Sequence, residues 1–297
     1  MEEMKINGQI FTKQLDVPEL IYRIQSLLPV KEAARTCVLS NSWRHTWSTI
    51  PNLRFCQYKK RLNNEQMEMY ISLIRLTIER YLRDSIPIKS FDLEFNVQDK
   101  KWVPPICECV QKVTSESCLK DLYLQLIFAK DLEMTLKVRN LAYLRNLKIH
   151  VVRKDTNVLE IYHLPSLQCL DYSDPSTSLC VRKPIAFNID SLSNMKELVL
   201  NFETIDDSIV EIINSKFPFL ESLTLDMQQC ISGILDITSV SLKSLSLLSD
   251  MQIYIQVCAP KLQRFHYTGR DIPGLMFPSV APDQIKLTFK LGKRIDQ

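Results

Sequence analysis

The sequence predicts an α/β protein in which a short helical unit precedes a long solenoid of parallel strands. Two observations lead to this prediction. A pattern of spaced leucines recurs through the C-terminal two thirds of the chain, and residues 15–53 carry apolar side chains at helical spacing. The chain has 297 residues, of which 45% are hydrophobic, so it can form one large folded unit and a small one.

Residues 15–53 carry start and stop signals for three short helices. Asp16 and Glu19 predict a capping box at the first start, and Pro29 ends that helix. A second helix is expected over about 31–39, and a third carries two tryptophans one turn apart. Three short helices cannot hide all of the large apolar groups in this stretch. We therefore expect a partner to cover part of them.

A longer helix is expected after this unit, over residues 65–82. Its apolar side chains recur on one face, which should pack on the first turn of the solenoid and cap its core. These side chains are Met67, Tyr70, Ile71, Ile74, Ile78 and Tyr81.

The solenoid is predicted from copies of the pattern Leu-x-x-Leu-x-Leu, spaced 20 to 28 residues apart. The final Leu-x-Leu alternates with period two, so each copy reads as a short strand with one buried face. Neighbouring copies would stack into a parallel sheet, with helices or loops returning on the convex side, as at 206–213. A weaker copy begins at Ile88, and 285–289 is a last fragment. Seven clear copies begin at Leu119, Leu144, Leu167, Met195, Leu220, Leu242 and Leu262.

The side chains between the leucines point to the opposite, solvent face of each strand, where a target protein could bind. Their mixed polarity, with scattered Tyr, His and Arg, suits protein recognition better than catalysis. Plain solvated surface is the alternative at any one position. The candidate target-binding residues are Tyr123, Lys148, His150, Asp171, Asp226, Arg264 and His266.

The repeats resemble irregular leucine-rich repeats, and the N-terminal unit resembles the plant F-box family. The F-box pattern is matched by Pro18, Leu20, Ile24, Ser26, Leu28, Pro29, Lys31, Ala33, Val38, Leu39, Ser40, Trp43 and Trp47. Gln25 departs from it, since leucine is common there. The resemblance implies binding to a Skp-type adaptor of a cullin-RING ubiquitin ligase. The expected adaptor-binding residues are Pro18, Leu20, Ile21, Leu28, Pro29, Val38 and Trp43. Internal packing is expected above all for Ile24, Leu27, Leu39 and Trp47.

The expected organisation is therefore an α/β chain of five segments. They are a disordered N-terminus at 1–14, an F-box at 15–55, a helical spacer at 56–87, a leucine-rich-repeat solenoid at 88–290 and a tail at 291–297. The resemblance implies a substrate-receptor subunit of a Skp-cullin-F-box (SCF) ubiquitin ligase, with a target protein on the repeats. The alternative is a ligase-independent scaffold that binds a partner through the same repeats.

Composition argues against other classes. The formal net charge is +3, with 37 basic and 34 acidic residues, so we expect no nucleic-acid partner. Nine cysteines without regular spacing favour a reduced, cytoplasmic or nuclear protein, and no apolar run predicts a membrane segment. Five glycines and four scattered histidines leave no phosphate-binding loop or metal motif. We expect no catalytic residue, metal or cofactor.

Overall fold

The structure is a computed structural model, and part of the chain is described in it. The described residues are 5–6, 9–10, 18–56, 62–97, 99–115, 118–128, 134–152, 157–174, 186–187, 192–249, 251–277 and 285–291. Asp16 of the predicted capping box and residues 292–297 of the predicted tail lie outside them. Within the predicted disordered segment at 1–14, two short strands, β1 (Lys5–Ile6) and β2 (Gln9–Ile10), pair antiparallel.

The N-terminal unit consists of the expected helices. They are α1 (Pro18–Leu27), α2 (Val30–Arg35) with the following 3-10 turn η1 (Thr36–Val38), and α3 (Asn41–Thr49). The Ser40 side chain caps α3 by accepting a hydrogen bond from the Trp43 N–H at 3.4 Å. Inside the unit, the buried Gln25 amide donates to the Thr36 hydroxyl at 2.7 Å and to the Trp43 carbonyl at 3.0 Å. Gln25 thus joins α1 to the other two helices.

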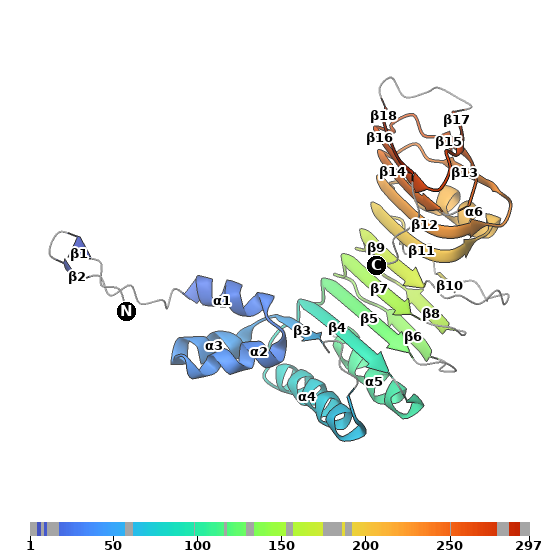
Figure 1. The fold of residues 1–297 in the computed structure, drawn as a ribbon. Coiled ribbons are helices and arrows are strands. Elements are labelled where there is room, and N and C mark those ends of the chain that lie inside the picture. The colour runs from blue at the N-terminus through green and yellow to red at the C-terminus, as the bar shows by residue number, and fades with distance from the viewer. Residues whose placement is uncertain are drawn as a thin grey trace.

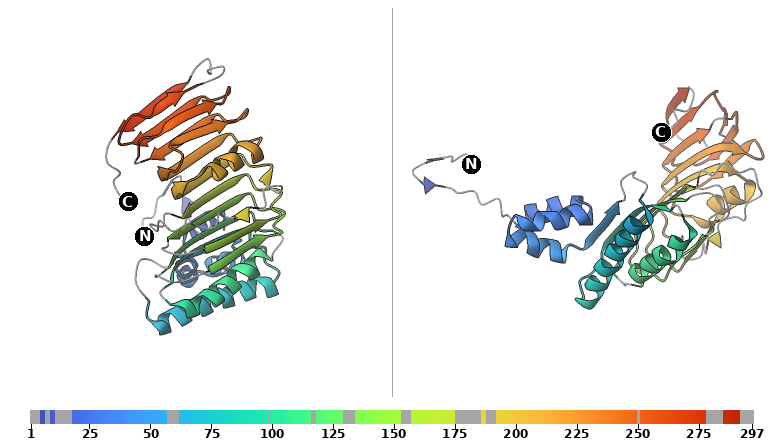
Figure 2. Two further views of the ribbon diagram at one scale, coloured as in Figure 1. Left: turned by 90° about the vertical axis from the view of Figure 1, so that its right-hand side faces the viewer. Right: turned by 60° about the horizontal axis from the view of Figure 1, so that its bottom comes forward.

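One parallel sheet of ten strands forms the body of the molecule, and its strands lie side by side in sequence order (Figures 1 and 2). Every clear copy of the leucine pattern is a strand of this sheet, which confirms the predicted solenoid. The strands are β3 (Asn52–Cys56), β4 (Ser90–Val97), β5 (Asp121–Phe128), β7 (Asn146–Val152), β9 (Cys169–Asp174), β11 (Glu197–Ile205), β12 (Ser222–Cys230), β14 (Ser244–Ser249), β16 (Arg264–Gly269) and β18 (Lys286–Leu291).

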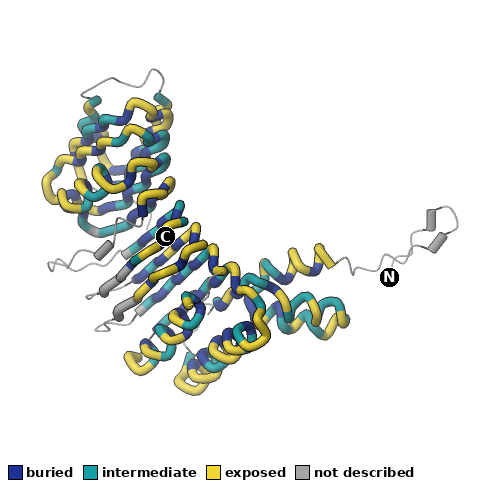
Figure 3. The backbone as a smooth tube through the Cα atoms, turned by 180° about the vertical axis from the view of Figure 1, so that it is seen from behind, coloured by how far each residue is buried: buried dark blue, intermediate teal, exposed yellow. Residues whose placement is uncertain are grey.

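The strands pair in a register that aligns the leucines. Leu122 of β5 is opposite Leu147 of β7, which in turn is opposite Leu170 of β9. The aligned side chains are buried in every strand but the terminal β18, and the residues between them are at least partly exposed, so burial alternates along the strands (Figure 3). The predicted period of two is confirmed.

Each repeat enters its strand through a turn and then fixes itself to the previous repeat. In the repeat of β7, the Leu144 N–H donates to the Leu141 carbonyl at 3.4 Å. The next two N–H groups, of Arg145 and Asn146, both donate to the Lys120 carbonyl of the preceding repeat, at 2.7 and 3.1 Å. Among the described residues, eight carbonyls accept two N–H groups in this way. They belong to Pro51, Lys89, Lys120, Arg145, Gln168, Lys196, Glu221 and Lys243.

The solenoid begins one repeat earlier than predicted. β3 pairs with β4 along its whole length, so the sheet starts at Asn52 and not at residue 88. The pattern Ile50-x-x-Leu53-x-Phe55 is a further copy, with all three apolar side chains buried. It was missed because it directly follows the third helix. The expected helix α4 (Asn64–Arg83) is therefore the return segment of the first repeat, and its buried face packs into the core as predicted.

The convex side differs in part from the prediction of helices or loops. Helices are present as α4, the turn η2 (Lys100–Trp102), α5 (Val103–Thr114) and α6 (Asp207–Lys216), and Asp206 caps the last of these. Elsewhere the chain returns as short parallel strands. They are β6 (Met134–Arg139), β8 (Asn157–Tyr162) and β10 (Ala186–Phe187), then β13 (Ile234–Thr238), β15 (Tyr254–Cys258) and β17 (Gly274–Met276). The last repeats are the shortest, which leaves room for a strand but not for a helix of several turns.

The helical unit and the solenoid meet around one arginine. Arg80 of α4 lies 4.4 Å from the centre of the Trp47 ring of α3 and 4.9 Å from that of Tyr81. Its Nε and Nη2 atoms are buried and have no hydrogen-bond partner among the described residues. Stacking on the two rings therefore holds this guanidinium. Trp47, for which packing inside the N-terminal unit was expected, contacts Arg80 of the solenoid.

Two glycines provide a test of how tightly the repeats stack. A Cβ on Gly269 of β16 would overlap the Tyr267 hydroxyl and lie 2.6 Å from the Ser249 carbonyl oxygen, which is fixed in the next strand. Gly269→Ala should therefore lower the free energy of unfolding by about 1–3 kcal/mol. Gly274→Ala, whose Cβ meets only the exposed Tyr254 ring, should cost much less.

Urea unfolding followed by circular dichroism measures both variants. Equal losses for the two alanines would contradict close packing between β14 and β16.

Candidate functional site

The first candidate surface is the outside of the N-terminal helices. Of the predicted adaptor-binding residues, Pro18, Leu20 and Val38 are exposed, and Leu28 and Trp43 are half-buried. Val38 is 86% exposed, an unusual state for a valine in a folded unit. These five side chains can reach a partner.

Two of the predicted adaptor-binding residues lie inside the unit. Ile21 has no exposed surface, and Pro29 is buried at the start of α2, where its carbonyl accepts from Glu32 and Ala33. Ile21 and Gln25, one turn apart on α1, form the face that packs toward α3. Because a polar glutamine shares this inner face, the apolar pattern alone did not separate the buried Ile21 from the exposed Leu20.

Three of the four side chains expected to pack internally are exposed. Leu27 is 74% and Leu39 is 63% exposed, and Ile24 is 37% exposed. Together with Leu20, Ile24 and Leu27 form an outward apolar stripe on α1 at spacings of four and three residues. With Val38, these side chains give the small unit a large apolar surface.

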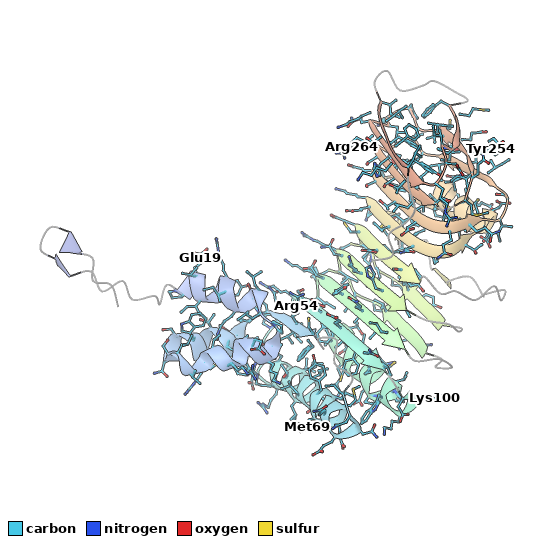
Figure 4. All side chains as sticks on the ribbon, viewed as in Figure 1. Glu19, Arg54, Met69, Lys100, Tyr254 and Arg264 are labelled. Atoms are coloured by element: carbon cyan, nitrogen blue, oxygen red, sulfur yellow. The ribbon has the colours of Figure 1, made fainter. Side chains whose placement is uncertain are left out.

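The second candidate surface is the concave face of the ten-stranded sheet. Arg54 on β3 and Arg264 on β16 lie near its two ends (Figure 4). Four of the predicted target-binding residues come together in its N-terminal half. Asp171 binds the Lys148 ammonium at 2.7 Å and the His150 Nε2 at 3.1 Å.

Tyr123 completes this cluster. Its ring meets the His150 ring edge-on, with 5.9 Å between centres, and the Lys148 ammonium lies 5.6 Å from the Tyr123 ring centre. The cluster of Tyr123, Lys148, His150 and Asp171 spans β5, β7 and β9. Their side chains hold one another in place on an otherwise open face.

The electrostatics of this half depend on two aspartates. Burial raises the pKa of Asp92 on β4 to about 6, although Arg54 lies 3.0 Å away and opposes the rise. The Asp92 Oδ1 atom is buried without a hydrogen-bond partner among the described residues. Burial would also raise the pKa of Asp171, but the hydrogen bonds from His150 and Lys148 outweigh it, and the pKa is lowered. Burial raises the pKa of Tyr123 to about 12.

The remaining predicted target-binding residues lie apart from this cluster. Asp226 is on β12, and Arg264 and His266 are on β16, so at least β11 separates them from Asp171 on β9. His266 lies 3.1 Å from the Thr268 hydroxyl of its own strand. Arg54 and Asp92 belong to the face but were not predicted, since the first of their strands was not recognised and the second was a weaker copy.

The described residues contain neither a candidate metal site nor a candidate membrane-spanning helix. No group of three His, Cys, Asp or Glu side chains within the described ranges could hold a metal ion. In the same part of the chain, no helix combines the length and the apolar character that crossing a bilayer requires.

Comparison with known proteins finds proteins that are similar in sequence to this chain. No family model matches the chain. A protein of Arabidopsis thaliana named as an F-box/LRR-repeat protein is 38% identical over 69 residues, 23% of this chain and 22% of the relative. A second of that name is 24% identical over 212 residues, 70% of this chain and 36% of the relative.

An F-box/FBD/LRR-repeat protein of the same plant is 33% identical over 79 residues, 26% of this chain and 19% of the relative. The chain resembles plant F-box/LRR-repeat proteins. This confirms the resemblance found in the N-terminal helices and in the leucine pattern. The matched region of the chain spans about a fifth to about a third of the length of these relatives.

The raised pKa of Asp92 predicts a pH-dependent stability. The folded state keeps a proton that the unfolded state, with a pKa of 3.8, releases at lower pH, so stability falls as pH rises from about 4 to about 6. Asp92→Asn mimics the protonated form. Its melting temperature should exceed that of the wild type at pH 7.5, and the difference should shrink at pH 5.

The exposed Asp271→Asn serves as the matched control and should show no such pH dependence. The Asp92→Asn variant could instead be less stable than the wild type by the same amount at both pH values. That result would show that the ion pair with Arg54 stabilises the carboxylate by more than its burial costs.

Proposed function

We propose that the chain is the substrate-receptor subunit of an SCF-type ubiquitin ligase. In this proposal the N-terminal helices bind a Skp-type adaptor, and through it a cullin-RING ligase, while the concave face binds a target protein. The observation that carries the proposal is the outward apolar surface of Leu20, Leu27, Val38 and Leu39 on a unit with a small core. Apolar side chains gathered in this way mark a protein interface.

The adaptor surface is supported by how the helices divide their side chains. Ile21 and Gln25 form the buried face of α1, whereas Leu20, Ile24 and Leu27 remain 43%, 37% and 74% exposed. Covering apolar area contributes about 25 cal/mol per Å². An adaptor that covers this stripe and Val38 would therefore gain a substantial part of its binding free energy from them.

The target surface is supported by the ion-paired cluster on the concave face. Lys148, His150 and Asp171 already restrain one another, so a target would lose less conformational freedom there than on isolated side chains. Cation, anion and aromatic ring lie within one patch. Such a patch selects a partner by charge pattern as well as by shape.

The proposal requires no catalytic residue from this chain. A receptor subunit accelerates ubiquitin transfer by holding the target near the charged enzyme, which raises the effective concentration of the two. Contact between Arg80 and Trp47 supports this role, because it joins the adaptor-binding unit to the repeats. A protein with this role would act in the cytoplasm, the nucleus or both.

Co-purification of the full chain with a plant Skp-type adaptor tests the proposal. The wild type should bind, and Val38→Asp should weaken binding at least about tenfold, because a carboxylate would have to be buried against an apolar surface. Val240→Asp is the matched control. Val240 is also exposed, at 69%, but lies in the solenoid, and its variant should bind as the wild type does.

Two results would count against the receptor role. If the folded wild-type chain does not bind the adaptor, a ligase-independent scaffold that uses the same repeats is the better account. If Val38→Asp binds as well as Val240→Asp, the adaptor surface lies elsewhere.

A further inference from the structure

The rim of the solenoid, where the concave strands begin, carries a groove bounded by two rows of side chains. One row comes from the residue just before each strand, and the other from the residue two positions earlier in the turn. The depression between them has a volume of about 570 Å³. Its lining includes Arg145, Gln168, Lys196, Glu221 and Lys243 from the first row, and Ser166, Phe219, Ser241 and Lys261 from the turns.

The backbone fixes the spacing of the first row. Gln168 donates its N–H to the Arg145 carbonyl at 2.9 Å, Lys196 to Gln168 at 2.8 Å, and Glu221 to Lys196 at 2.8 Å. Each row member therefore sits one strand from the next, about 4.8 Å away. Arg145, Lys196 and Lys243 occupy every second strand, so successive cations are about 10 Å apart.

Most of these cations are available to a ligand. Arg145, Lys196 and Lys261 are exposed, and none forms an ion pair with a carboxylate of the described residues. Lys243 is different, because it binds Glu221 at 2.8 Å and lowers the pKa of that carboxyl. The groove thus holds a net positive charge on a chain whose total charge is only +3.

The spacing of the cations fits an extended peptide. In the polyproline II conformation a peptide has three residues per turn and rises about 3.1 Å per residue, so every third side chain returns to the same face about 9 Å farther along. A peptide running along the rim, across the strand starts, would place acidic side chains at positions i and i+3 beside Arg145 and Lys196. Phe219, which is 60% exposed on the turn side, offers an apolar contact to a residue of the same peptide.

We propose that this groove binds an extended acidic segment of a partner protein, with carboxylates three residues apart on Arg145 and Lys196. Single cations about 10 Å apart suit singly charged carboxylates, as the Lys243–Glu221 pair in the same groove shows. The inference deepens the proposed function, since the segment would belong to a target, and it adds the rim to the concave face as a binding surface.

The groove fits a peptide better than a nucleic acid. Glu221 lies within the row, between Lys196 and Lys243, and would repel a continuous phosphate backbone. A peptide avoids this repulsion by placing a neutral residue opposite Glu221. The turn row adds hydroxyl side chains and an aromatic ring, which suit side chains of mixed polarity.

Fluorescence anisotropy with the full chain tests the proposal. The probe is a labelled nine-residue peptide with three glutamates, each three residues from the next, and prolines between them to favour the polyproline II backbone. The wild type should bind it, and a peptide of the same composition with adjacent glutamates should bind several-fold more weakly. The double variant Arg145→Glu, Lys196→Glu should lose at least about tenfold in affinity.

The matched control is Lys89→Glu, Lys120→Glu. These lysines belong to the same row and give the same change in net charge, but they lie outside the groove. Their double variant should lose less than about threefold. Equal losses in the two double variants, or equal binding of the two peptides, would overturn the proposal. Both variants exchange exposed side chains, and circular dichroism confirms folding.

Two further probes separate the alternatives. A peptide with phosphoserine in place of the glutamates that binds more than about tenfold tighter would overturn the carboxylate assignment. A single-stranded oligonucleotide that displaces the peptide at equal charge would overturn the peptide assignment. Retention of adaptor binding by the Arg145→Glu, Lys196→Glu variant shows that a loss of peptide binding is separate from the receptor role.

Discussion

The carbonyl group just before each of the first eight concave strands accepts two N–H groups from the next repeat, and the rest of the solenoid depends on this contact. It uses both lone pairs of the oxygen and leaves the backbone no freedom to slip by one residue. A slip of one residue would turn every leucine outward. The fixed register aligns the leucines of successive repeats. It also brings Lys148 and His150 beside Asp171 and sets the cations of the rim groove in line.

Much of the fold could be predicted, because the leucines of the pattern are the side chains that the strands bury. All seven clear copies are strands, and period two separates inward from outward side chains at each of them. The copy at Ile50, Leu53 and Phe55 was hidden by its position against the third helix. The short convex strands were also missed, since five or six alternating residues carry a weak signal beside the dominant repeat.

The candidate surfaces could be predicted only in outline. Outward positions follow from the strand period, but which of them touch depends on the neighbouring repeat and on side-chain rotamers. Tyr123, Lys148, His150 and Asp171 form one cluster, whereas Asp226 and His266 do not join it. On α1, the buried Gln25 shows why hydrophobicity alone can choose the wrong helix face. Its amide satisfies two partners inside the unit, which an apolar residue could not do.

The sheet joins each strand to the one that came before it in the chain, and this order has a consequence for synthesis. β3 and α4, which close the N-terminal end of the core, leave the ribosome before any other part of the solenoid. Every later repeat can then pair with the edge strand of the sheet already formed. The contacts that it makes there join residues only 20 to 40 positions apart along the chain. The protein can therefore assemble from its N-terminus, one repeat at a time, without waiting for its C-terminal residues.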